Sequence, residues 1–86
     1  MRLEGKRAIV TGAGSGFGAG IARKFAAEGA QVIVADIDGD AAHDVADDIG
    51  GTPMTCNVAD STSVDVMLRV VLGQGPLDIL VNNAGV

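Results

Sequence analysis

The segment 11–18, which reads TGAGSGFG, constrains the fold of this chain more than any other, because it places four glycines within seven residues. An apolar run over residues 7–10 precedes it, and large apolar side chains recur every four positions from 17 to 25, as on one face of a helix. The glycines therefore join a predicted strand over 7–10 to a predicted helix over 16–28.

Such a junction suits a bound phosphate. A helix start carries unpaired backbone N–H donors and about half a unit of positive charge, and glycine lets the backbone approach a ligand closely. Gly14, Gly16 and Ala19 fit the pattern GxGxxA, whereas Gly12, Gly16 and Gly18 fit TGxxxGxG. Either pattern places backbone amides against a pyrophosphate, as in a Rossmann-type site. The alternative interpretation is a tight turn that only packs a helix on a strand.

Composition narrows the range of partners and compartments. The 86 residues make one domain at most, and with 2% aromatic residues the core must be aliphatic. The net charge of −5 argues against nucleic acid or an anionic membrane and favours a small ligand. The single cysteine, Cys56, cannot form an internal disulfide, and no segment resembles a signal peptide or a membrane span. We therefore expect a cytoplasmic protein.

The rest of the chain alternates between strand-like and helix-like segments. This alternation predicts an α/β fold with a parallel sheet and helices on both faces. In such sheets ligands bind beyond the carboxyl ends of the strands, where the unusual residues of this sequence fall. The predicted strands cover 7–10, 31–35, 54–56 and 77–81, and the predicted helices cover 16–28, 42–49 and a segment that Ser61 or Thr62 caps and that runs to 72.

Asp36 is the candidate contact for an adenosine ribose. It follows the second predicted strand and lies 18 residues beyond Gly18, near the spacing of about 20 at which an acidic residue meets this ribose. Its charge would repel a 2′-phosphate, and neither Ser15 nor Ile37 supplies a basic side chain. NAD is therefore favoured over NADP. The alternative is an aspartate that only ends the strand, and the acidic residues after it form a solvated helix face.

Amide side chains follow the third and fourth predicted strands. Asn57 could bond the edge of an adenine, and Val58 could line its pocket. The segment 82–85 reads NNAG, and two amides directly after a buried strand bond either neighbouring strands or a ligand. The alternative for this segment is a polar turn.

Together, TGAGSGFG at 11–18, Asp36, Asn57–Val58, and DILV followed by NNAG at 78–85 resemble the short-chain dehydrogenase/reductase family over the whole chain. The resemblance implies a doubly wound Rossmann-type fold with strand order 3-2-1-4, an alcohol or ketone substrate, hydride transfer with NAD(P), and a dimer or tetramer. By this likeness Asn82 ties strands together. The implied cofactor contacts are Gly12, Ser15, Gly16, Phe17 and Gly18 at the pyrophosphate and nearby ribose, Asp36 with Ile37 beside it at the adenosine ribose, Asn57 and Val58 at the adenine, and Asn83, Ala84 and Gly85 near the fourth strand.

The sequence departs from the family pattern in three ways. Phe17 stands where Ile or Leu is usual, and Asn57 stands where Asp is commonest. The catalytic Ser and the YxxxK pair of the family lie beyond NNAG, and this chain has no Tyr. We therefore expect residues 1–86 to be an NAD-binding half-domain, truncated after the fourth strand, with no catalytic residue of its own.

Other functions and sites remain open or unsupported. The chain could be a nucleotide-binding module without catalysis, or an interaction fragment whose sheet edge docks on another chain. No metal site is expected, because His43 has no second ligand at metal-binding spacing. The substrate is undetermined, since a 3-oxoacyl thioester, a sugar and a polyol all fit.

Overall fold

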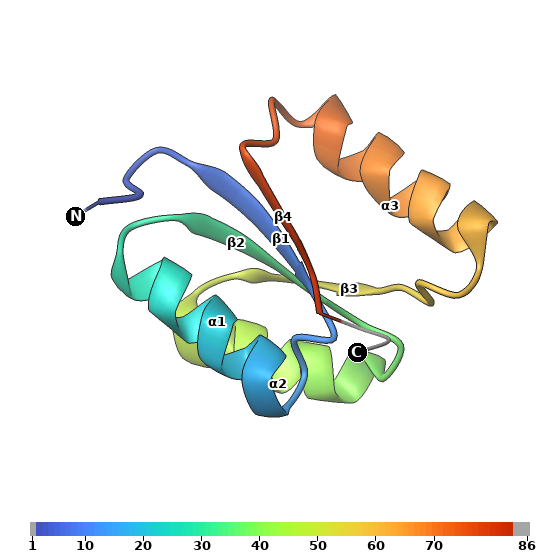
Figure 1. Cartoon of the computed structure of the whole chain (residues 1–86), viewed down its shortest axis with the longest axis horizontal. Coiled ribbons are helices and arrows are strands. Elements are labelled where there is room, and N and C mark those ends of the chain that lie inside the picture. The colour runs from blue at the N-terminus through green and yellow to red at the C-terminus, as the bar shows by residue number, and fades with distance from the viewer. Residues whose placement is uncertain (1, 84–86) are drawn as a thin grey trace.

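The computed structural model describes residues 2–83, which form a four-stranded sheet with strand order β3-β2-β1-β4. Helices α1 and α2 cover one face of the sheet and α3 covers the other (Figure 1). No helix within residues 2–83 has the length and apolar composition needed to cross a membrane. The elements are β1 (Arg7–Thr11), α1 (Gly16–Ala27), β2 (Gln31–Asp36), α2 (Gly39–Ile49), β3 (Thr52–Thr55), α3 (Ser61–Gly73) and β4 (Ile79–Asn82).

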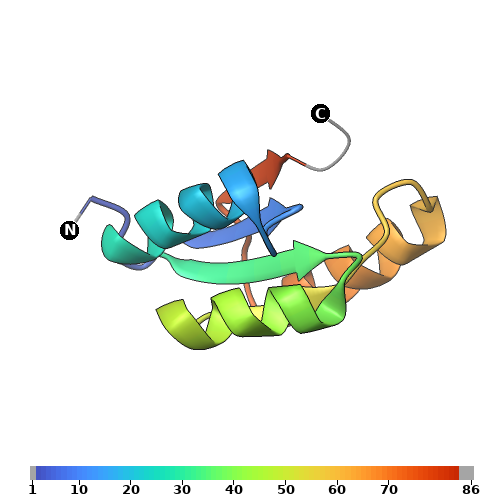
Figure 2. The same ribbon diagram turned by 90° about the horizontal axis from the view of Figure 1, so that it is seen from below.

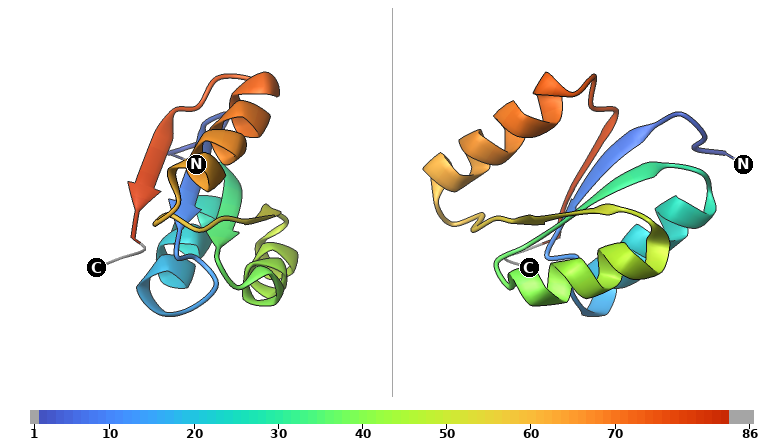
Figure 3. Two further views of the ribbon diagram at one scale, coloured as in Figure 1. Left: turned by 90° about the vertical axis from the view of Figure 1, so that its right-hand side faces the viewer. Right: turned by 180° about the vertical axis from the view of Figure 1, so that it is seen from behind.

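All neighbouring strands run parallel, so their carboxyl ends meet at one edge of the sheet (Figure 3). In the central register, Ile9 of β1 lies opposite Ile33 of β2 on one side and Leu80 of β4 on the other. This arrangement confirms the doubly wound fold and the strand order 3-2-1-4.

The sheet separates two apolar cores, because successive strand residues point to opposite faces. Val10 and Val34 pack under α1 and α2, which lie side by side (Figure 2). Ile9 and Ile33 pack on the other face, against Met67 of α3. The second core also includes Cys56, which is buried.

Two helices start at aspartate caps that differ from the predicted helix starts. The Asp38 carboxylate accepts a hydrogen bond from Ala41 N (3.1 Å), so α2 starts at Gly39 and not at Ala42 as expected. Asp60 accepts from Thr62 N (3.0 Å) and caps α3, so neither Ser61 nor Thr62 is the cap. Each carboxylate satisfies a backbone donor that a helix start leaves unpaired.

The third and fourth strands differ from their predicted bounds by two residues at most at either end. β3 starts at Thr52, and Cys56 lies just beyond it although its backbone N still donates to Asp36 O (2.9 Å). β4 starts at Ile79 rather than Leu77, and it extends to Asn82. Pairing with β1 nevertheless reaches Asp78, whose backbone N donates to Arg7 O (3.0 Å).

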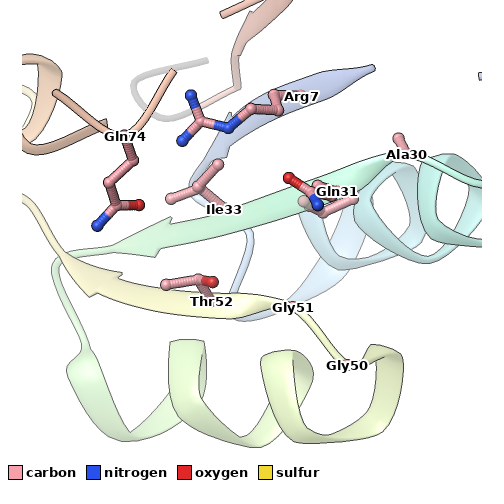
Figure 4. Close-up of a pocket in the computed structure, with 9 residues that line it drawn as sticks. Arg7, Ala30, Gln31, Ile33, Gly50, Gly51, Thr52 and Gln74 are labelled. Carbon is pink, nitrogen blue, oxygen red and sulfur yellow. The ribbon is translucent and has the colours of Figure 1, made fainter. Parts of the chain in front are cut away.

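A hollow of about 360 Å³ lies at the amino ends of the strands, on the opposite edge from the glycine loop (Figure 4). Nη1 of Arg7 donates to the carbonyl oxygens of Val71 (3.0 Å), Gly75 (2.7 Å) and Pro76 (3.1 Å). These bonds satisfy carbonyls at the end of α3 and in the turn after it. The arginine therefore has a structural role that accounts for its position. The lining includes Arg7, Gln31, Thr52 and Gln74.

Candidate functional site

The glycine loop connects β1 to α1 at the carboxyl edge of the sheet. Gly12 and Gly16 have φ angles of +62° and +59°, in the left-handed region that favours glycine. A Cβ atom on Gly18 would collide with the carbonyl oxygen of Gly12 and would lie 2.9 Å from Ala13 Cα. The first turn of α1 therefore rests directly on the backbone of the loop.

Gly14 is constrained from a different side. A Cβ atom at this position would lie 2.7 Å from Ala41 Cβ and 2.9 Å from Asp36 Oδ2. Each of the two glycine patterns found in the sequence thus includes a glycine at a close approach. Gly18 of TGxxxGxG packs on the loop itself, and Gly14 of GxGxxA packs against Asp36 and the start of α2. Neither Gly14 nor Ala41 was among the predicted site residues, although Gly14 belonged to one of the two patterns.

The amino terminus of α1 has no carboxylate partner within the described chain. Ser15 occupies the N-cap position, but its side chain makes no capping hydrogen bond, and the first turn contains no acidic residue. By contrast, α2 and α3 both start at aspartate caps. Ser15, Gly16 and Phe17 are exposed. The positive end of α1 is therefore accessible to an anion, and its glycines leave room for one to approach.

Asp36 ends β2 beside this loop. Its Oδ2 accepts a hydrogen bond from Gly14 N (2.9 Å), and its Oδ1 accepts one from Asp38 N (2.9 Å). Ile37 follows and is 66% exposed, so the chain turns outward directly after the carboxylate. The acidic group that the sequence placed near the loop is in contact with it.

The end of β4 is joined to the end of β1 through Thr11. The Thr11 hydroxyl lies 3.1 Å from Asn82 Oδ1 and accepts a hydrogen bond from Asn83 N (3.0 Å). Asn83 Nδ2 also lies 3.5 Å from the carbonyl oxygen of Gly12. Asn82 therefore links neighbouring strands, as expected, and Asn83 reaches the first residue of the glycine loop.

Asn57 and Val58 follow β3 at the same edge of the sheet. Asn57 N donates to Ser63 Oγ (3.0 Å), and Asn57 Oδ1 accepts from Ala59 N (3.0 Å), which holds the segment in a turn. The Val58 side chain packs against the core beneath α3, beside a hollow of about 220 Å³ that Thr11 also lines.

The fold thus brings one set of predicted residues to the carboxyl edge of the sheet. No group of three or more His, Cys, Asp or Glu side chains within residues 2–83 could hold a metal ion. Ala84 and Gly85, which were also predicted to contact the cofactor, lie outside the described residues. The predicted residues found at this edge are Gly12, Ser15, Gly16, Phe17, Gly18, Asp36, Ile37, Asn57, Val58 and Asn83.

Known proteins share both the sequence and the fold. The model of the family described as short chain dehydrogenase matches residues 6–86. The chain is 44% identical to the 7alpha-hydroxysteroid dehydrogenase of Escherichia coli K12, over 99% of the chain and 36% of that protein. It is 43% identical to the D-threitol dehydrogenase of Mycolicibacterium smegmatis, over 100% of the chain and 35% of that protein.

A solved structure of a 7alpha-hydroxysteroid dehydrogenase, in complex with NADH and 7-oxo glycochenodeoxycholic acid, matches the fold with a TM-score of 0.90. The identity is 44%, and the match covers 99% of this chain and 36% of that one. The chain thus spans about a third of the length of the relatives it matches. The family match extends over nearly the whole sequence and the strand order agrees with it, so the chain belongs to the short-chain dehydrogenase family of oxidoreductases.

Proposed function

We propose that residues 1–86 are the cofactor-binding half-domain of an NAD-dependent oxidoreductase, which transfers a hydride between nicotinamide and an alcohol or carbonyl substrate. The observation that carries this proposal is the juxtaposition of two groups. The uncapped positive end of α1 lies beside the Asp36 carboxylate, which is bonded to Gly14 in the loop. A dinucleotide has an anionic pyrophosphate and ribose hydroxyls, which complement these two groups.

The residues would act at separate parts of the cofactor. The first amides of α1 would bind the pyrophosphate, and Asp36 would accept hydrogen bonds from the adenosine ribose. When bound, the nicotinamide would supply or accept the hydride. This chain would bind and orient the cofactor. The proposed contacts are Gly12, Ser15, Gly16, Phe17 and Gly18 for the pyrophosphate and nearby ribose, Asp36 and Ile37 for the adenosine ribose, Asn57 and Val58 for the adenine, and Asn83, Ala84 and Gly85 near β4.

The hydride transfer also requires catalytic residues that this chain does not contain. The relatives are about three times as long as this chain, and family resemblance places their general-acid tyrosine beyond the NNAG segment. This chain contains no Tyr, so it cannot supply a phenol as a general acid. We therefore infer a complete enzyme in which this chain is continued by a catalytic segment.

We expect the 86 residues alone to turn over no alcohol or ketone with NAD(H) or NADP(H). A chimera in which they replace the matching third of the Escherichia coli 7alpha-hydroxysteroid dehydrogenase should bind NADH, and it should oxidise a 7α-hydroxysteroid when NAD⁺ is supplied to accept the hydride. Cofactor absorbance at 340 nm measures turnover, with heat-killed protein as the control. Turnover by the isolated chain, or a folded chimera that does not bind NADH, would contradict the proposal.

The complete enzyme should bind NADH more tightly than NADPH by about tenfold or more, which corresponds to about 1.4 kcal/mol. The reason is the charge of Asp36, which repels a 2′-phosphate, with no basic residue at Ser15 or Ile37 to offset it. Replacement of Asp36 with alanine should narrow this ratio. Titration of both cofactors measures the ratio of their affinities, and Asp40→Asn, which removes an exposed carboxylate of the same charge from the first turn of α2, should leave it within about twofold. Equal or tighter NADPH binding by the unmodified enzyme would disprove the NAD assignment.

A further inference from the structure

The Asp36 carboxylate is bonded to the glycine loop as well as to its own strand end. Oδ2 accepts from Gly14 N at 2.9 Å, and this bond joins residues 22 positions apart. Oδ1 accepts from Asp38 N at 2.9 Å, within the turn that leads to α2. One side chain therefore connects the middle of the loop, the end of β2 and the approach to α2.

A second bond joins the loop to β2, and it differs in kind. Ala13 N donates to the carbonyl oxygen of Ala35 at 3.0 Å. This bond uses only backbone atoms, so it does not depend on the identity of either side chain. The neighbouring bond from Gly14 exists only because residue 36 carries an acceptor. Substitution at Asp36 thus removes one of two adjacent anchors and keeps the other.

The packing around Gly14 leaves little space for independent movement. A Cβ atom there would meet both Ala41 and the Asp36 carboxylate, at 2.7 Å and 2.9 Å. Ala41 in turn donates its backbone N–H to the Asp38 carboxylate at 3.1 Å, which fixes the first turn of α2. The glycine loop, the Asp36 carboxylate and the start of α2 therefore lie in contact. The hydrogen bond from Gly14 N to Asp36 is the polar interaction between the carboxylate and the loop.

We propose that Asp36 is a positioning residue for the glycine loop, in addition to the ribose contact assigned to it above. The inference rests on the proposed function, because the loop matters for catalysis only if it holds a cofactor. A carboxylate offers about four lone-pair positions, of which the two N–H groups use two. The remaining positions accept the ribose hydroxyls, so both roles are possible at once. The carboxylate then holds the loop amides in place for the pyrophosphate before the cofactor arrives.

A cofactor analogue separates the two roles. The analogue of NADH that lacks the 2′- and 3′-hydroxyls of the adenosine ribose cannot donate to Asp36 at all. If Asp36 also positions the loop, Asp36→Ala in the complete enzyme should still weaken binding of this analogue by about tenfold, since a hydrogen bond to a charged acceptor is lost. Calorimetric titration measures the affinity, and Asp40→Asn should change it by less than about twofold. Equal affinity of the analogue for the unmodified enzyme and for Asp36→Ala would overturn the proposal.

Amide hydrogen exchange in the absence of cofactor is a second test of the positioning role of Asp36. In the ligand-free enzyme, Asp36→Ala should speed amide hydrogen exchange at Gly14 by about tenfold, while Ala13, which is bonded to Ala35, serves as the internal reference. Unchanged exchange at Gly14 would overturn the positioning role. If the unmodified enzyme fails to bind NADH, the proposed function fails, and the exchange result still decides whether Asp36 holds the loop.

Discussion

Replacement of Gly18 with alanine is expected to lower the free energy of unfolding of the complete enzyme by about 3 kcal/mol, at the upper end of what overpacking a fixed site costs. The added Cβ would collide with the carbonyl oxygen of Gly12 and approach Ala13 Cα at 2.9 Å. Both are backbone atoms of the loop, so no side-chain rotation relieves the contact. The loop must move away from α1, and NADH affinity should fall with it. Urea denaturation and calorimetric titration measure the two effects.

Gly20 offers a matched control two residues further along the same helix. A Cβ atom there meets nothing within 4 Å. The residue is exposed to solvent and lies away from both ends of α1. Gly20→Ala should therefore stabilise the protein, by about 0.5 to 1 kcal/mol, because alanine favours the helical conformation. If Gly18→Ala were as stable as the unmodified protein and bound NADH equally well, the close approach of α1 to the loop would not hold in solution.

The fold could be predicted from the sequence because each strand and helix has its own local signal. The apolar run at 31–35 and the four-residue spacing of apolar side chains in the predicted first helix are both local patterns. The starts of α2 and α3 could not be assigned so well. Asp38 and Asp60 are residue types that serve equally in turns and as helix caps, and only the positions of the backbone donors distinguish the two uses.

The location of the candidate site could be predicted from the sequence, but the contacts between its residues could not. Parallel strands bring Asp36 and the glycine loop to one edge, so their proximity follows from the fold. The bond from Gly14 N to Asp36 Oδ2 depends on how the loop turns after β1, and no local pattern specifies that path. For the same reason, the sequence did not reveal that Ser15, a good capping residue by type, leaves the start of α1 uncapped.

The two outer strands of the described sheet differ in how their free edges are protected. Cys56 N and Asp78 N both donate inward, to Asp36 O and Arg7 O. Donors alternate along a parallel ladder, so residues 53 and 55 of β3 and residues 79 and 81 of β4 face outward. Position 53 is a proline, which has no N–H to offer, so β3 presents one outward donor, at residue 55. β4 has no proline and therefore presents free donors to another strand.

The surface beside this β4 edge is also apolar. Leu80 in the strand is 53% exposed, and it lines a hollow together with Val64 and Leu68 of α3. Natural sheet edges are usually blunted by charge, proline or cover, and an unprotected apolar edge pairs with other chains. We therefore expect the β4 edge, more than the β3 edge with its Pro53, to pair with another strand.

We therefore expect residues 1–86, expressed alone, to self-associate through β4 and to show no cooperative thermal transition as a monomer. Ile79→Pro tests the edge directly, since it removes an outward N–H at the first residue of the strand, where proline is tolerated. Ile79→Ala is the matched control, because it also removes the isoleucine side chain but keeps the backbone N–H of residue 79. If pairing of the edge drives association, light scattering should show a smaller mass for Ile79→Pro than for Ile79→Ala at equal concentration. A monomeric, cooperatively melting unmodified chain, or equal masses for the two variants, would show that the β4 edge does not cause association.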